Sequence, residues 1–208
     1  MTSWPDKSTR ISRRLGICVA FTLLLGLQCW VDIGWGKKKP PIYDDPEGYA
    51  VLSLLLSNAG QDIHSPTILI NSTSAVEGPD GITSLEKCVK VPEDFREAAD
   101  DYLQKTKSSY LFLEKFALKA PYRLVSKRPR SFDDLKHPPK SDKEIADRIS
   151  SGMFILSPVG FDSGHTHAIV RKTYLCGSLC GWGSYHFLVK SAGGWEETKG
   201  VTRCSWQF

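Results

Sequence analysis

The sequence lacks the motifs that would assign it to a common class of enzymes or nucleotide-binding proteins. It contains no G-x-S-x-G nucleophile turn, and neither G-x-x-x-x-G-K-[ST] nor G-x-G-x-x-G occurs. No stripe of lysine and arginine alternates with aromatic residues, so nothing predicts nucleic-acid binding. Internal repeats and low-complexity tracts are absent as well. These absences exclude function classes and assign none.

The N-terminus has the pattern that directs a nascent chain to a membrane. Four basic residues between Lys7 and Arg14 precede an uncharged, mostly apolar run at residues 15–31. The run is longer than the roughly 7–15 residues of a signal-peptide core and shorter than the about 20 of a spanning helix. We expect residues 1–36 to be a cleaved signal peptide, with an uncleaved membrane anchor as the alternative. The rest of the chain is then extracytoplasmic: in the periplasm, secreted, or anchored through residues 15–31.

The composition beyond this leader is that of one folded domain. Removing residues 1–36 leaves about 170 residues, enough for a single domain with a proper core. The whole chain has six tryptophans and nine phenylalanines, a content that argues against wholesale disorder. Much of the net charge of +4 lies in the leader and in Lys37–Lys39, so the domain is nearly neutral. We expect a linker at residues 37–48, a domain at residues 49–208, no cofactor, and membrane contact only through an uncleaved leader.

Periodicity predicts two helices and two strands in the first part of the domain. A helix is expected from Pro46, ended by glycine near residue 60, because its apolar residues share one face: Tyr49, Leu52, Leu55 and Leu56. A second helix is expected over residues 91–109, with Pro92 in its first turn. Residues 66–74 are rich in β-branched side chains and predict a strand, and residues 122–126 have strand character.

The last third of the chain changes to strand-like patterns. Four runs are separated by turns rich in glycine and serine: residues 151–161, 166–176, 184–190 and 194–204. Short connections favour antiparallel hairpins. The expected fold is therefore α+β: an N-terminal signal or anchor helix, two helices, then a C-terminal antiparallel β-meander. The polar, proline-rich residues 127–144 are expected to be an exposed connection.

Four of the six cysteines lie beyond the leader, which allows three pairings in an oxidising compartment. Cys176 and Cys180 flank a glycine-containing turn, so we expect a disulfide that closes a hairpin. A redox-active pair, or thiols that are free or bound to metal, are the alternatives. Cys88 and Cys204 would then form a second disulfide.

Three histidines raise the question of a metal or catalytic site. His165 and His167 are two residues apart and would share one face of a strand. With His186 and the two cysteines of the turn they could offer zinc a tetrahedral ligand set. Because this spacing is not an established one and a disulfide would remove both sulfurs, we predict no metal. Cys88 lies just before the second predicted helix and the histidines follow on strands, an order that cysteine hydrolases of the cell envelope also show.

One stretch of the C-terminal third carries a specific pattern. It consists of a Val-Gly-Phe segment, an alanine in the next strand, two Cys-Gly pairs, a lysine, a glycine and a tryptophan: Val159-Gly160-Phe161, Ala168, Cys176-Gly177, Cys180-Gly181, Lys190, Gly194 and Trp195. This pattern resembles the C-terminal part of uncharacterised exported proteins of environmental bacteria. The resemblance extends loosely over residues 49–208 and departs at His167, where that family more often has glutamine. It implies export and this strand order, and it implies no activity.

These observations lead to two functional hypotheses. The first is an exported or envelope-attached module, not an enzyme, that binds a ligand or serves as a scaffold. The alternative is an envelope hydrolase or metalloprotein that uses either Cys88 or the set His165, His167 and His186. The sequence predicts neither the ligand nor a partner.

Overall fold

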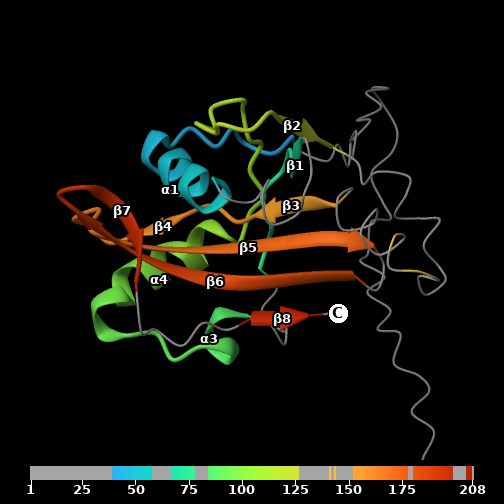
Figure 1. The fold of residues 1–208 in the computed structure, drawn as a ribbon. Helices are drawn as coiled ribbons and strands as arrows, with labels where there is room; N and C mark the ends of the chain where they lie inside the picture. The colour runs from blue at the N-terminus through green and yellow to red at the C-terminus, as the bar shows by residue number, and fades with distance from the viewer. Residues whose placement is uncertain are drawn as a thin grey trace, which may run out of the picture. The chain divides into compact units, whose positions relative to one another are not determined.

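The computed structural model describes residues 39–57, 67–77, 84–126, 141, 143, 152–177, 180–198 and 205–207. They belong to one unit, residues 38–208, in which short helices pack on both faces of a β-sheet (Figure 1). The predicted leader, residues 1–36, and nearly all of the predicted connection at residues 127–144 lie outside the described residues. None of the helices described is long and apolar enough to cross a membrane.

Helix α1, Pro46–Leu56, confirms the first predicted helix. The Asp45 side chain caps it by accepting a hydrogen bond of 2.9 Å from the Gly48 backbone N–H. Pro46 occupies the first turn, where its missing N–H is not needed. The predicted apolar stripe is buried, with Leu52 and Leu56 completely so. Burial of this stripe, rather than helix propensity alone, stabilises so short a helix.

The second predicted helix is shorter than residues 91–109. A 3-10 turn, Glu93–Phe95, leads into α4, Arg96–Lys105. Thr106 still makes the helical bond to the Tyr102 carbonyl at 2.9 Å, but the next two N–H groups bond three residues back, to Gln104 and Lys105, so the helix ends in a tight turn. Beyond this turn the chain pairs with a distant loop, where the Tyr110 carbonyl accepts from the Ser74 N–H at 2.8 Å. Tertiary pairing therefore outcompetes helix extension.

The sheet has eight strands with the order β2-β1-β3-β5-β6-β7, while β4 pairs with β5 and β8 pairs with β6. The strands are β1 Ile68–Asn71, β2 Tyr122–Val125, β3 Met153–Leu156, β4 Gly160–Phe161, β5 His167–Gly177, β6 Cys180–Ser191, β7 Gly194–Glu197 and β8 Ser205–Gln207. Figure 1 shows them side by side, from β2 and β1 at one side to β6 and β8 at the other.

The fold is α+β, and the sheet as a whole is mixed, because the expected C-terminal antiparallel meander is joined by parallel strands. β1 pairs in parallel with both β2 and β3. From β3 onward the neighbours are antiparallel: β3 with β5, β5 with β6, and β6 with β7. The meander is thus one part of a larger sheet. The two earlier strands, whose positions were predicted, extend it at the β3 side.

The predicted strand at residues 184–190 is longer in the structure, where β6 begins at Cys180, and two other predicted runs are divided differently. The run at residues 151–161 forms two strands, β3 and β4, which pair with successive parts of β5. The break lies at Pro158, which has no N–H for a sheet ladder, and beside it the Ser157 hydroxyl accepts from the Arg171 N–H at 2.8 Å. The run at residues 194–204 contains only β7 among its described residues, and β8 begins just after it.

Alternation along β5 and β6 places a hydrophobic layer on each face of the sheet. One layer includes Ala168, Val170 and Leu188 and packs against α1. The other includes Ile169 and Phe187 and packs against α4 and against α3, Leu85–Cys88. We call these the α1 face and the α4 face. Even-numbered residues in the middle of β5 and β6 point to the α1 face, and odd-numbered residues point to the α4 face.

Candidate functional site

Cys176 and Cys180 form a disulfide at the turn that joins β5 to β6, with Cα atoms 5.0 Å apart. This is the pair that the sequence predicts, and it lies beside the pairing of Gly177 with Cys180. Cys88 is disulfide-bonded too. Cys204 lies outside the described residues, so the Cys88–Cys204 pair stays a prediction. A disulfide-bonded Cys88 has no thiolate to act as a nucleophile, which removes it from the catalytic candidates.

His165 is part of the turn before β5 and not of a strand, contrary to the expectation that it shares a strand face with His167. Its backbone φ is 50°, an uncommon value for a residue other than glycine. Its ring is stacked on Phe161, with centroids 4.8 Å apart. Its Nδ1 lies 2.7 Å from Oε2 of Glu47, at the start of α1. The side chain is thereby directed towards the α1 face.

The Glu47 carboxylate contacts two donors in addition to His165. These contacts join α1 to the end of the sheet. Lys190 forms an ion pair with its Oε1, and the Trp195 indole N–H donates to the same oxygen at 3.2 Å. Desolvation raises the pKa of the Glu47 carboxyl, but the hydrogen bonds from Lys190 and His165 lower it more, so the net shift is downward. With its oxygens held by these donors, Glu47 acts as a structural anchor.

His167 lies on the α4 face, where its ring meets Phe95 edge to face at 4.8 Å. Its Nδ1 is 3.1 Å from the Asp162 carboxylate. His186 pairs with Val170 in the register of β5 and β6 and therefore points to the α1 face. The two rings lie on opposite faces of the sheet, so they cannot bind one ion together.

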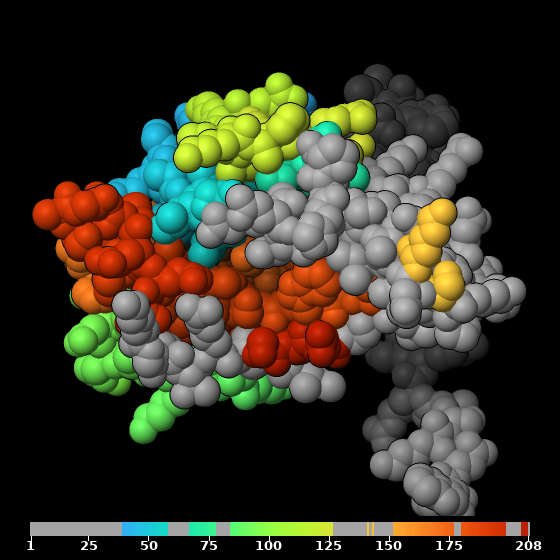
Figure 2. All heavy atoms as spheres, viewed as in Figure 1, coloured from blue at the N-terminus to red at the C-terminus, as the bar shows by residue number. Residues whose placement is uncertain are grey.

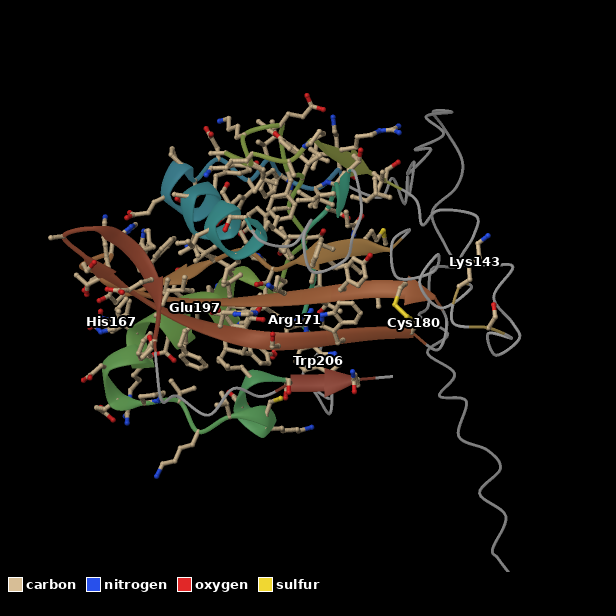
Figure 3. The ribbon with its side chains drawn as sticks, in the orientation of Figure 1. Lys143, His167, Arg171, Cys180, Glu197 and Trp206 are labelled. Atoms are coloured by element: carbon tan, nitrogen blue, oxygen red, sulfur yellow. A yellow bond between two sulfur atoms is a disulfide. The ribbon has the colours of Figure 1, made fainter. Side chains whose placement is uncertain are left out.

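The hypothetical zinc site is therefore not assembled. His167 and Cys180 lie at opposite ends of the β5–β6 hairpin (Figure 3). Cys176 is nine positions after His167 on the same strand, which corresponds to roughly 30 Å at about 3.3 Å per residue. Within the described part of the chain, no three His, Cys, Asp or Glu side chains cluster in a way that could hold a metal ion. Sequence spacing suggested the set, and strand alternation together with strand length separates its members.

His186 instead belongs to a hydrogen-bonded chain that the sequence analysis did not identify. Its Nε2 lies 2.8 Å from the Ser184 hydroxyl, and its Nδ1 bonds to Oε1 of Glu197. The His186 residue is only 6% exposed, whereas Ser184 is half-buried. We call these three residues, Ser184, His186 and Glu197, the relay. The arrangement is that of a hydroxyl, a base and a carboxylate that orients the base.

Strand geometry explains how the relay is built. Ser184 and His186 are two apart on β6 and so share one face. Glu197 pairs with Leu188 on β6 and is a diagonal neighbour of His186, within reach of a long side chain. Lys172 lies directly opposite Ser184 on β5, and its Nζ donates to the Leu55 carbonyl of α1 at 3.1 Å. The one sequence feature that could have indicated the relay is the spacing of Ser184 and His186, two residues apart in a predicted strand. The position of Glu197 beside them could be found only from the register of β6 and β7.

A hollow of about 590 Å³ lies next to the relay. We call it the β6–β8 hollow; the residues lining it are Trp182, Gly183, Ser184, Ser205, Trp206 and Gln207. Register places Trp182, Ser184, Ser205 and Gln207 on the α1 face, the face to which His186 also points. Figure 2 shows α1 (cyan) over another part of this face and β8 (dark red) clear of that helix. Ser184 thus belongs both to the relay and to the hollow.

Trp206 also lines the hollow and pairs with Gly183 in the β6–β8 register. Its ring lies over Gly183, where an added Cβ would come within 2.3 Å of the indole, and it packs against Tyr185 with ring centroids 5.8 Å apart. Trp182 is held against Tyr174 at 4.5 Å. The described side chains that line the hollow are aromatic, hydroxyl or amide groups, and none carries a charge.

No protein-family model, curated protein or solved structure matches this chain.

Proposed function

We propose that the chain is an exported protein whose domain binds a neutral, hydroxyl-rich small molecule, such as a sugar, in the β6–β8 hollow. The observation that carries this proposal is the uncharged lining of aromatic, hydroxyl and amide groups. Small-molecule sites have volumes of about 300–1,000 Å³ and combine aromatic walls with a few polar groups. The hollow fits both conditions.

The lining favours this ligand class over charged ones. An anionic or cationic ligand would lose hydration without gaining an ion pair from the lining, at a cost of several kcal/mol. A sugar presents apolar C–H faces that suit an indole such as that of Trp182. It also presents hydroxyls that can exchange hydrogen bonds with Ser205 and Gln207, which are both exposed. Binding therefore requires little rearrangement of the strands.

Export is supported by the N-terminal sequence and by the disulfide bonding of Cys88, Cys176 and Cys180, since such bonds persist in oxidising compartments. Residues 1–45, fused to a reporter that is active only outside the cytosol, should give a positive signal. Mass spectrometry of the mature protein should find an N-terminus near Lys37 if the leader is cleaved. A chain that keeps Met1 in the membrane fraction would support the anchor instead, and a silent reporter would contradict export.

The binding proposal is tested by titrating the full chain with a panel of neutral mono- and oligosaccharides, followed by calorimetry. Gln207→Ala should weaken binding about 5- to 10-fold, the effect of one lost hydrogen bond. Gln104→Ala is the matched control, because Gln104 lies on α4 outside the hollow and its loss should leave the Kd unchanged. Absence of binding to any neutral sugar, or equal weakening by both variants, would contradict the proposal.

A further inference from the structure

The relay has a defined direction for its proton. A carboxylate only accepts hydrogen bonds, so the His186 Nδ1 that contacts Glu197 must carry hydrogen. When the imidazole is neutral, this tautomer presents Nε2 as an acceptor 2.8 Å from the Ser184 oxygen, and the Ser184 O–H is then the donor. A serine hydroxyl that donates to an oriented imidazole is the starting arrangement of nucleophilic catalysis by serine.

The histidine of the relay is shielded from solvent, whereas the serine at one end of the relay borders a hollow. His186 is buried. Ser184 lines the β6–β8 hollow, so a molecule held there can reach its hydroxyl. Hydrogen-bonded histidines also occur as purely structural groups, but such a group does not require its hydroxyl partner to open into a hollow. The combination of a shielded base and an accessible hydroxyl points to chemistry at Ser184.

We infer that Ser184 is a nucleophile that hydrolyses small neutral carboxylic esters bound in the β6–β8 hollow. This inference rests on the proposed function in that the same hollow holds the ligand. The Ser184 oxygen attacks the ester carbonyl, and its proton passes to Nε2 of His186. The tetrahedral intermediate collapses, the C–O bond to the alcohol breaks, and His186 returns the proton to the departing alkoxide.

Water completes the cycle. It attacks the acyl group on Ser184 and gives a proton to His186, which returns this proton to the Ser184 oxygen as the carboxylic acid leaves. One ester and one water are thus converted to one acid and one alcohol, with no oxidant or metal. Glu197 is a positioning residue, which holds the imidazole in the productive tautomer and stabilises its cationic form. Four other residues that line the hollow carry side-chain hydrogen-bond donors suited to the carbonyl oxygen: Trp182, Ser205, Trp206 and Gln207.

The direct test is covalent labelling of the folded full chain with a fluorophosphonate, which reacts with activated serines. Trypsin releases residues 173–190 between Lys172 and Lys190, and fragmentation of this peptide distinguishes Ser184 from Ser178. We expect the label on Ser184 and its loss in Ser184→Ala. Ser191→Ala is the matched control. Ser191 lies at the exposed end of the same strand and does not line the hollow, so labelling of Ser184 should persist there.

Kinetics with p-nitrophenyl acetate and butyrate then separate positioning from folding. Glu197→Gln keeps the size of the side chain and should lower kcat by about 100-fold or more. The KM should change little, because Glu197 is not part of the lining. A melting temperature close to that of the wild type would show that the variant is folded. A fall in kcat that merely follows a loss of folded protein would overturn the role given to Glu197.

The outcomes distinguish this inference from the binding proposal. Sugar binding without any label on Ser184 in the wild type would leave the binding proposal standing and overturn the esterase inference. Labelling and ester hydrolysis that vanish in Ser184→Ala, without sugar binding, would support the inference and refute the ligand class proposed above. Equal labelling of wild type and Ser184→Ala would also overturn it, because the reaction would then occur elsewhere on the chain.

Discussion

His167 and His186 project from the same pair of strands but lie on opposite faces of the sheet. His167 meets Phe95 on the α4 face, whereas His186 bonds to Ser184 on the α1 face. A side-chain period of two in each strand causes this separation. The two histidines therefore have different roles, and neither supports the other as a metal ligand.

The first prediction concerns metal content. Elemental analysis of the purified full chain should find substoichiometric zinc, and His167→Ala should leave that content unchanged. The reason is geometric, since strand alternation separates His167 from His186 and the cysteines of the turn are oxidised. Stoichiometric zinc that is lost in His167→Ala would show that the metal hypothesis from the sequence was correct after all.

The second prediction concerns acid stability at the β4–β5 turn. Desolvation raises the pKa of the Asp162 carboxyl, but hydrogen bonds from the His167 and Thr166 backbone N–H groups and from both side chains lower it more. The folded pKa therefore lies well below the unfolded one. A depressed pKa contributes stability above the unfolded pKa, and this contribution is lost as the pH falls below about 4 towards the folded value.

Asp162→Asn should accordingly lower the melting temperature at pH 7 and differ much less from the wild type near pH 2. Thr166→Val removes one of the donors, at 2.6 Å, and keeps the carboxyl. Thr166→Val should therefore also lower the melting temperature more at pH 7 than near pH 2, but by a smaller amount than Asp162→Asn. A melting difference between Asp162→Asn and the wild type that does not shrink in acid would contradict this assignment.

The third prediction concerns the hairpin disulfide. The double variant Cys176→Ala/Cys180→Ala should reduce the free energy of unfolding by about 2 kcal/mol, because the closed loop is short. Peptide mapping without reduction should recover Cys176 linked to Cys180. Free thiols at both positions, or a link from Cys176 to Cys204, would contradict the pairing.

The fourth prediction concerns the close approach of β4 to α4. A Cβ added at Gly160 would lie 2.4 Å from the Ala98 carbonyl oxygen and from the Tyr102 nitrogen, both backbone atoms. Gly160→Ala should therefore cost about 2–3 kcal/mol of stability, as overpacking does. Gly164→Ala is the matched control, since the nearest atom to its added Cβ lies 3.6 Å away. Equal denaturation midpoints for the two variants would contradict the packing described.

Local patterns of the sequence predicted much of the fold. The apolar stripe ending at Leu56 identified α1, and the β-branched residues near Ile68 identified β1. Non-local relations were not predictable in the same way. The parallel pairing of β1 with β2 joins Ile68 to Tyr122 across more than fifty residues, and no local pattern specifies such a partner.

The candidate site shows the same division. The short spacing of Cys176 and Cys180 predicted their disulfide, because a turn brings neighbours in sequence together. The relay was missed because Glu197 reaches His186 only through the register of β6 and β7. The hollow was missed because Gln207 and Ser205 enter it through pairing of β8 with β6, which skips the β7 strand. Sites that depend on strand order require the fold before they can be recognised.

The most direct test of the central claim is the location of the ligand in the β6–β8 hollow. Proton–nitrogen NMR spectra of the labelled full chain should be recorded during titration with the neutral sugar that binds most tightly. We expect the largest shift changes at the Trp182 indole and at the backbone amides of Ser184, Ser205 and Gln207, with the Trp195 indole nearly unchanged. Shift changes centred on Trp195, or spread evenly over the domain, would contradict the assignment of this hollow as the binding site.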